Sequence, residues 1–224
     1  MVTLDGQSLT MADVKVVAVT NVRVVVDQNA RERMVRARGA VSSLVDANSP
    51  VYGVNTGVGL LANTRLSSSD LEQLQLNVIR SHACGCGAPL AREVVRAMML
   101  IRANVLAKGL SGVRAEVAET LCQLLNLGVT PVVPSRGSVG ASGDLAPLAH
   151  IALVLVGEGK AEVGGRICSG RVERHHGRYG RQHLLSQHQR AEASLSGFRA
   201  AVALRHDPQL GLRGQHHPSV QERR

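Results

Sequence analysis

The tripeptide Ala141-Ser142-Gly143 could do chemistry that no ordinary side chain does. If the chain bends tightly, the amide nitrogen of Gly143 can attack the carbonyl carbon of Ala141, and loss of water closes a five-membered ring. Glycine suits the attacking position because it has no Cβ and tolerates unusual backbone angles. Loss of the Ser142 hydroxyl as a second water leaves an exocyclic methylidene group conjugated to the ring. The expected product is a strong carbon electrophile.

The tripeptide lies in a glycine-rich stretch, residues 137–150, that leads into a predicted helix. Asp144 and Pro147 are typical of a helix start, and an apolar run follows them. A phosphate-binding loop would need Gly-Lys-Ser/Thr, whereas Gly143 is followed by Asp144, so that motif is absent. On these residues alone, a plain glycine- and serine-rich loop before a helix remains an alternative.

Three segments together resemble a known enzyme family. Residues 137–150 resemble the signature of the histidine and phenylalanine ammonia-lyases, whose Ala-Ser-Gly triad cyclises into methylidene-imidazolone. Residues 51–59 resemble that family's Tyr-Gly-x-Asn-Thr-Gly-Phe-Gly segment, although Val58 replaces the usual phenylalanine. Residues 80–85 resemble its next block. The match runs almost continuously from about residue 4 to about residue 168.

The resemblance implies a role for each candidate site residue. Tyr52 matches the base that removes the β-proton of the substrate, and His82 matches a histidine that contacts the substrate ring in histidine and tyrosine lyases. The cofactor implied is methylidene-imidazolone formed from Ala141, Ser142 and Gly143. Elimination of ammonia needs both a base and a group that makes nitrogen a better leaving group. Taken without the resemblance, Tyr52 and His82 are more typical of structural residues.

The activity implied is that of an enzyme, histidine ammonia-lyase, which converts L-histidine into urocanate and ammonia. The alternative within the same chemistry is a tyrosine ammonia-lyase or aminomutase, because His82 also suits a tyrosine ring. The expected partner is a small amino acid substrate. The family forms homotetramers, which is an expectation for the family rather than for this chain.

Composition narrows the class of protein. Of 224 residues, 44% are hydrophobic but only three are aromatic, so a core must consist of Leu, Val, Ala, Ile and Met. No apolar run reaches the ~18 residues needed to span a bilayer. The first residues resemble no secretory signal, so we expect a cytoplasmic protein without a membrane partner. Cys84 and Cys86 flank one glycine, but no second pair completes a metal site with His82, so no metal is expected.

Apolar spacing predicts a mainly α fold, the N-terminal part of a large helical bundle with small extended and loop elements. Thr10 and Asp13 fit a capping box that opens a short helix. Ser69 and Asp70 are expected to cap a later helix. Helices are predicted over 28–45, 70–79, 92–108 and 113–125 and after the tripeptide, an extended piece over 23–26 and a loop over 52–59.

The chain changes character after Cys168. Residues 169–224 hold ten arginines against four acidic residues, which supplies six of the nine net positive charges, and seven of the nine histidines. Helical periodicity is lost, so we expect an ammonia-lyase region over 1–168 and a disordered, non-lyase tail over 169–224. Enrichment in Arg, Gly, His, Gln and Pro is typical of GC-rich DNA translated out of frame. We therefore predict that the tail is a frameshift product.

The tail bears on function in two ways. Its aromatic residues are limited to Tyr179 and Phe198 and it carries no recognisable motif, so nucleic acid is not the expected partner. In the family, an Asn, a second Tyr, an Arg and a Glu from later in a longer chain and from neighbouring subunits complete the site. None of them maps onto residues 169–224, so we expect a truncated chain with weak or no activity. The alternative from another class is a non-catalytic fragment or a basic-tailed binding protein.

Overall fold

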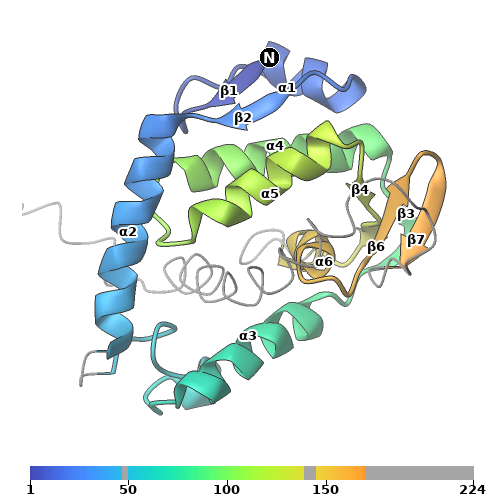
Figure 1. The fold of residues 1–224 in the computed structure, drawn as a ribbon. Helices are drawn as coiled ribbons and strands as arrows, with labels where there is room; N and C mark the ends of the chain where they lie inside the picture. Colours follow the sequence, from blue (N-terminus) through green and yellow to red (C-terminus); the bar gives the residue numbers. More distant parts are fainter. Residues whose placement is uncertain (47–49, 139–144, 170–224) are drawn as a thin grey trace, which may run out of the picture.

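The computed structural model describes residues 1–46, 50–138 and 145–169, and within these ranges the fold is mainly helical, as predicted (Figure 1). The helices are α1 (Met11–Val19), α2 (Gln28–Asp46), α3 (Ser68–His82), α4 (Arg92–Ala107), α5 (Ala115–Asn126) and α6 (Leu145–Leu155), with a short 3-10 turn at Gly59–Leu61. The strands are β1 (Val2–Leu4), β2 (Val24–Val26), β3 (Cys86–Pro89), β4 (Thr130–Pro131), β5 (Pro134–Arg136), β6 (Lys160–Val163) and β7 (Arg166–Ser169).

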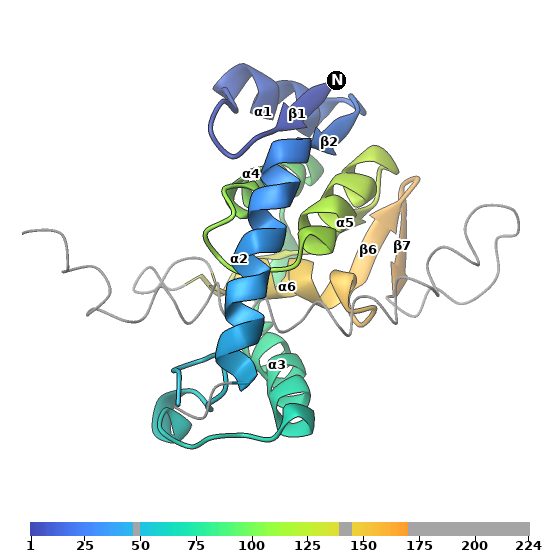
Figure 2. The ribbon, with the colours of Figure 1, turned by 60° about the vertical axis from the view of Figure 1, so that its left-hand side comes forward.

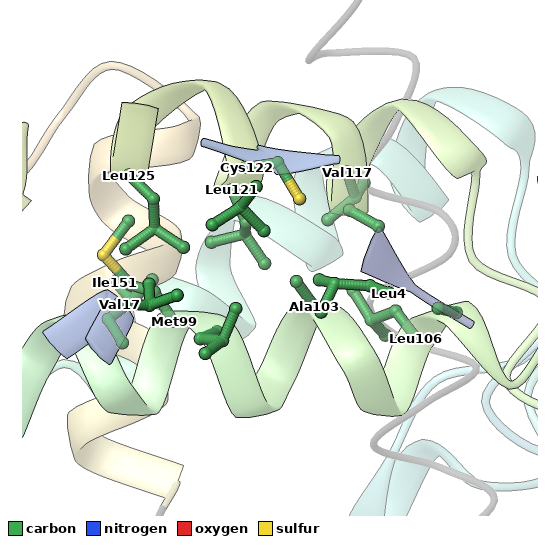
Figure 3. Packing of buried hydrophobic residues seen from close by; sticks show 14 of the residues in the cluster. Leu4, Val17, Met99, Ala103, Leu106, Val117, Leu121, Cys122, Leu125 and Ile151 are labelled. Carbon is green, nitrogen blue, oxygen red and sulfur yellow. The ribbon is translucent and has the colours of Figure 1, made fainter. Parts of the chain in front are cut away.

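The main hydrophobic core forms around α4 and α5, which lie side by side (Figure 1). Their apolar positions recur every three or four residues, so each helix presents one continuous stripe. Burying a large aliphatic side chain of this kind contributes about 1.5 to 3 kcal/mol. The close view shows Met99, Ala103 and Leu106 of α4 facing Val117, Leu121, Cys122 and Leu125 of α5, with Leu4, Val17 and Ile151 arriving from other elements (Figure 3).

The first 26 residues form a small β1-α1-β2 unit that covers α4 and α5 (Figure 1). The two strands are parallel, and Val2 is paired with Val24. Asn126, at the end of α5, holds β2 in place because its side-chain Nδ2 donates to Val24 O at 2.9 Å and its Oδ1 accepts from Val24 N at 2.8 Å.

Arg96 of α4 is fully buried although it has no carboxylate partner among its hydrogen bonds. Its guanidinium donates to the carbonyl oxygens of Val17, Ala18 and Thr20 at the end of α1, and to Leu125 O at the end of α5. The last carbonyls of a helix lack intrahelical donors and carry partial negative charge. Arg96 therefore satisfies the C-terminal ends of two helices at once.

Helix capping agrees with the sequence at one position and differs at another. The Thr10–Asp13 capping box is present, because Asp13 N donates to Thr10 Oγ1 at 3.2 Å and Thr10 N donates to Asp13 Oδ2 at 3.0 Å. The predicted cap at Ser69 is wrong, since α3 begins two residues earlier and its cap is Ser67. Ser67 Oγ accepts from Asp70 N at 3.2 Å, which is the usual reach from a cap to the third helical residue.

Helix α6 lies between α5 and α3 in both views (Figures 1 and 2). It packs on α3 through a second apolar cluster formed by Ile79, Ala152 and Val156. A three-stranded sheet in the order β4-β6-β7 joins β4, which precedes α6, to β6 and β7, which follow it. Strand β3 pairs with β5 in an antiparallel arrangement. None of the helices in the described ranges is long and apolar enough to cross a bilayer.

Candidate active site

Tyr52 lies half-buried in a tight turn that begins just after residue 50. Val54 N and Asn55 N both donate to Val51 O, at 3.0 and 3.2 Å, so the backbone closes on itself around the tyrosine. Gly53 takes a φ of 68°, a left-handed conformation that a side chain would disfavour. The loop predicted over 52–59 thus contains a hydrogen-bonded turn and ends where the 3-10 turn begins at Gly59.

Two buried polar side chains hold this turn, which we call the Tyr52 turn (residues 51–57). Asn55 Oδ1 accepts from Val51 N at 2.7 Å, and Asn55 Nδ2 donates to Leu44 O of α2 at 3.2 Å. Thr56 Oγ1 accepts from Gly53 N at 3.1 Å. Both residues are almost completely buried. The sequence contained them within the Tyr52 motif, but their positioning role depends on a contact with α2 that the motif does not reveal.

His82 is the last residue of α3, and its ring is hydrogen-bonded to its own helix. Nδ1 lies 2.7 Å from Val78 O, a carbonyl that can only accept, so the hydrogen on this ring sits on Nδ1. Nε2 of the neutral ring then carries a lone pair and can accept a hydrogen bond from a ligand. Two residues earlier, Arg80 forms a two-pronged ion pair with Glu158, in the turn after α6.

The tripeptide Ala141-Ser142-Gly143 lies outside the described residues, but the chain on either side of it is described. Before it, Gly137 approaches Gly85 so closely that a Cβ on Gly137 would lie 2.8 Å from Gly85 Cα and 3.5 Å from Ala146 Cβ. After it, His150 of α6 accepts a hydrogen bond from Gly85 N at Nε2, at 3.1 Å. Both described flanks of the tripeptide therefore meet at Gly85, three residues after His82.

The structure does not place Tyr52 in the same group. The Tyr52 turn is hydrogen-bonded to the chain just before α3, because Leu66 N donates to Asn55 O at 3.1 Å. His82 is at the opposite end of this 15-residue helix, which at 1.5 Å per residue is about 22 Å long. Figure 1 shows the two ends of α3, with α6 above the C-terminal one. The candidate residues thus form two groups rather than one pocket within the described chain.

The four cysteines are free thiols that differ in exposure. Within the described ranges, no three His, Cys, Asp or Glu side chains cluster closely enough to hold a metal ion. Cys84 and Cys86 are exposed, whereas Cys122 is buried between α4 and α5. Burial raises the pKa of the Cys122 thiol to about 12, so this sulfur stays protonated and unreactive near neutral pH.

We expect brief alkylation with iodoacetamide at pH 8 to modify Cys84 and Cys86 and to spare Cys122. Because Cys122 reacts only when the core opens, its rate should be at least about a thousandfold slower than theirs. Peptide mass spectrometry over a time course measures the three rates. In concentrated urea the rates should become similar, and equal rates without urea would contradict the core described above.

Comparison with known proteins identifies the family. Residues 9–179, more than half of the chain, match the family model described as aromatic amino acid lyase. The chain belongs to the aromatic amino acid lyase family. It is 46% identical over 206 residues to the histidine ammonia-lyase of Anaeromyxobacter sp. (strain K), covering 90% of this chain and 41% of that one. The chain therefore spans about two fifths of the length of this lyase relative.

Solved aromatic amino acid lyase structures share the fold. The crystal structure of histidine ammonia-lyase from Trypanosoma cruzi matches with a TM-score of 0.68 and 35% identity, over 75% of this chain and 32% of that one. Tyrosine aminomutase from Streptomyces globisporus matches with a TM-score of 0.69 and 38% identity, over the same shares. The described residues are thus the N-terminal part of the helical ammonia-lyase fold, as predicted from the sequence.

The sequence missed two residues that the structure brings into the site, Gly85 and His150. Both lie inside motifs quoted above, yet neither had been given a role. Their contact joins positions 65 residues apart, and no local pattern reveals a pairing of that kind.

Proposed function

We propose that this protein is a histidine ammonia-lyase, which eliminates ammonia from L-histidine to give urocanate. The observation that carries the proposal is the convergence at Gly85 of the His82 segment with both described flanks of Ala141-Ser142-Gly143. The high identity to histidine ammonia-lyases supports the same substrate.

The prosthetic group proposed is methylidene-imidazolone, formed from Ala141, Ser142 and Gly143, with no metal. The described flanks fit a tight bend, because glycine at 85 and 137 lets the backbones touch and Ala146 adds only a methyl group. The group would supply an electrophile that turns the substrate amine into a better leaving group.

Two side chains of this chain would act on the rest of the substrate. Tyr52 would remove the β-proton as the general base. The buried side chains of Asn55 and Thr56 would fix the backbone of its turn. His82 would accept a hydrogen bond at Nε2 from the polar ring of the substrate, since Nδ1–H already donates to Val78 O. An imidazole N–H can make this bond and a phenyl ring cannot.

A tyrosine ammonia-lyase or aminomutase is the second candidate, because the phenol O–H of tyrosine can also donate to His82 Nε2. The similarity to the tyrosine aminomutase from Streptomyces globisporus favours keeping this alternative. We further propose that the lyase is a homotetramer. Tyr52 and His82, at opposite ends of α3, would then meet in sites shared between subunits. For the 224-residue chain alone, whose length is about two fifths that of its relative, we propose weak or no turnover.

The test uses the full chain and a chimera that joins residues 1–168 to the remaining part of the Anaeromyxobacter lyase. In the chimera we expect the peptide containing residues 141–143 to be lighter by the mass of two water molecules, and L-histidine to yield urocanate. Ser142→Ala should abolish both the mass deficit and the product, because the methylidene carbon comes from the Ser142 side chain. Ser138→Ala, in the same stretch but outside the tripeptide, is the matched control and should retain both.

The possible results separate the two candidate substrates and test the expected weak activity of the 224-residue chain. Product from L-tyrosine but not from L-histidine would support the tyrosine enzyme. A folded chimera with neither the mass deficit nor a product from either amino acid would overturn the proposed function. Turnover by the 224-residue chain at the rate of the chimera would contradict the proposal that this chain is weakly active.

A further inference from the structure

His150 has no role in the function proposed so far, although it links two parts of the candidate site. It lies on α6, seven residues after Gly143, and its Nε2 accepts the N–H of Gly85 at 3.1 Å. A ring nitrogen that accepts must lack a hydrogen, so the neutral ring carries its hydrogen on Nδ1. Burial lowers the pKa of His150, which favours this neutral form.

The contact lies where the segment around Gly85 is closely packed against β5 and α6. A Cβ on Gly85 would lie 2.9 Å from His150 Nε2 and 3.2 Å from Arg136 O, both too close for an unstrained side chain. Gly137 also lies close to Gly85, at the distances given above. The position of Gly85 is therefore fixed by β5, which precedes the tripeptide, and by α6, which follows it.

The hydrogen bond between Gly85 and His150 holds the segment that follows His82, where α3 has ended. Before His82, α3 is held to the turn after α6 by the Arg80–Glu158 ion pair. After His82 the helix ends, and Gly85 N–H is the first backbone group to bond α6. One element, α6 with its following turn, thus anchors the chain on both sides of His82.

We propose that His150 is a positioning residue, which holds the segment after His82 against α6 and so sets the place of the His82 ring relative to the helix that follows Ala141-Ser142-Gly143. The role in catalysis rests on the proposed function, but the contact and its effect on His82 do not. A purely structural histidine would lower stability when replaced and leave the position of His82 unchanged.

Nuclear magnetic resonance of the full 224-residue chain tests the contact without any lyase activity. Labelling with nitrogen-15 should reveal a scalar coupling between Gly85 N and His150 Nε2 across the hydrogen bond. Chemical shifts of the His82 ring protons and nitrogens report the surroundings of the ring. Hydrogen exchange at the Gly85 amide reports the bond itself.

Three variants separate positioning from stability. His150→Leu removes the acceptor, so we expect about tenfold faster exchange at Gly85, the size of one lost hydrogen bond, and a change in the His82 ring shifts. His150→Gln carries an acceptor oxygen at similar reach and should restore both. Ile151→Ala, on the same helix but buried in the main core, should lower stability and change neither.

The proposal is overturned if the coupling is absent in the unmodified chain, or if His150→Leu leaves the His82 ring shifts unchanged. It is also overturned if Ile151→Ala moves His82 as much as His150→Leu does. If the chimera described above has no lyase activity, the proposed function fails while these spectra still decide the role of His150.

Discussion

Replacement of Arg96 by methionine is expected to lower the free energy of unfolding by about 3 to 5 kcal/mol, because each buried carbonyl left without a donor costs about 1 to 3 kcal/mol and the removal of a buried charge offsets part of that cost. Methionine fills a similar volume but donates nothing, so the carbonyls of Val17, Ala18, Thr20 and Leu125 lose their donor. The cost comes mainly from these buried, unpaired oxygens rather than from lost packing. A loss of this size is a large share of the stability of an ordinary domain.

Urea unfolding followed by far-ultraviolet circular dichroism measures the effect, with two comparison variants. Arg96→Lys keeps the charge, but the compact lysine ammonium cannot donate to all four carbonyls as the planar guanidinium does. We therefore expect an intermediate loss of stability. Arg23→Met, at an exposed position, should change stability by less than about 0.5 kcal/mol. If Arg96→Met and Arg23→Met unfold at the same urea concentration, Arg96 does not hold the helix ends together.

Replacement of Tyr52 by phenylalanine in the chimera should lower kcat by about 10² to 10⁴, the usual contribution of a general base. Phenylalanine keeps the half-buried ring and loses only the hydroxyl, so the Tyr52 turn should remain folded. Its backbone is held by Asn55 and Thr56, which the substitution does not touch. The mass deficit at residues 141–143 should also persist, because ring closure uses the tripeptide backbone and the Ser142 hydroxyl rather than the Tyr52 hydroxyl.

Steady-state kinetics with L-histidine measures the loss, and His82→Leu provides the comparison. If His82 binds the substrate ring, His82→Leu should raise KM, whereas Tyr52→Phe should act mainly on kcat. A Tyr52→Phe chimera with unchanged kcat would remove Tyr52 from the role of base. A Tyr52→Phe chimera without the mass deficit would instead place Tyr52 in the formation of the ring.

The sequence predicted the long helices well because their apolar spacing is strong and local. The predicted helix over 92–108 corresponds closely to α4, and that over 28–45 to α2. The short strands β3 to β7 were not predicted individually, because each is only two to four residues long, and β3 and β4 pair with partners far along the chain. Helical spacing also could not show that Arg96 is buried, since its acceptors belong to two other helices.

For the candidate site, the motifs gave the residue types but not their grouping. The His82 segment and the flanks of the tripeptide converge at Gly85, a contact across 65 residues that no periodicity encodes. The separation of Tyr52 from His82 follows from the length of α3 and from the hydrogen bonds of the Tyr52 turn. The roles of Tyr52, His82 and Ala141-Ser142-Gly143 stay predictions, as does the assignment of residues 169–224 as a non-lyase tail.

The contacts of Arg96 also set an order of events on the ribosome. The carbonyl of Thr20 precedes Arg96 by 76 residues, and that of Leu125 follows it by 29. At about 5 to 20 residues per second, the end of α1 is synthesised roughly 4 to 15 s before its donor. Until then the nascent β1-α1-β2 unit has neither its buried cation nor the helices it covers. A pause in translation between these positions should therefore lengthen the period in which the N-terminus is open to proteases and chaperones.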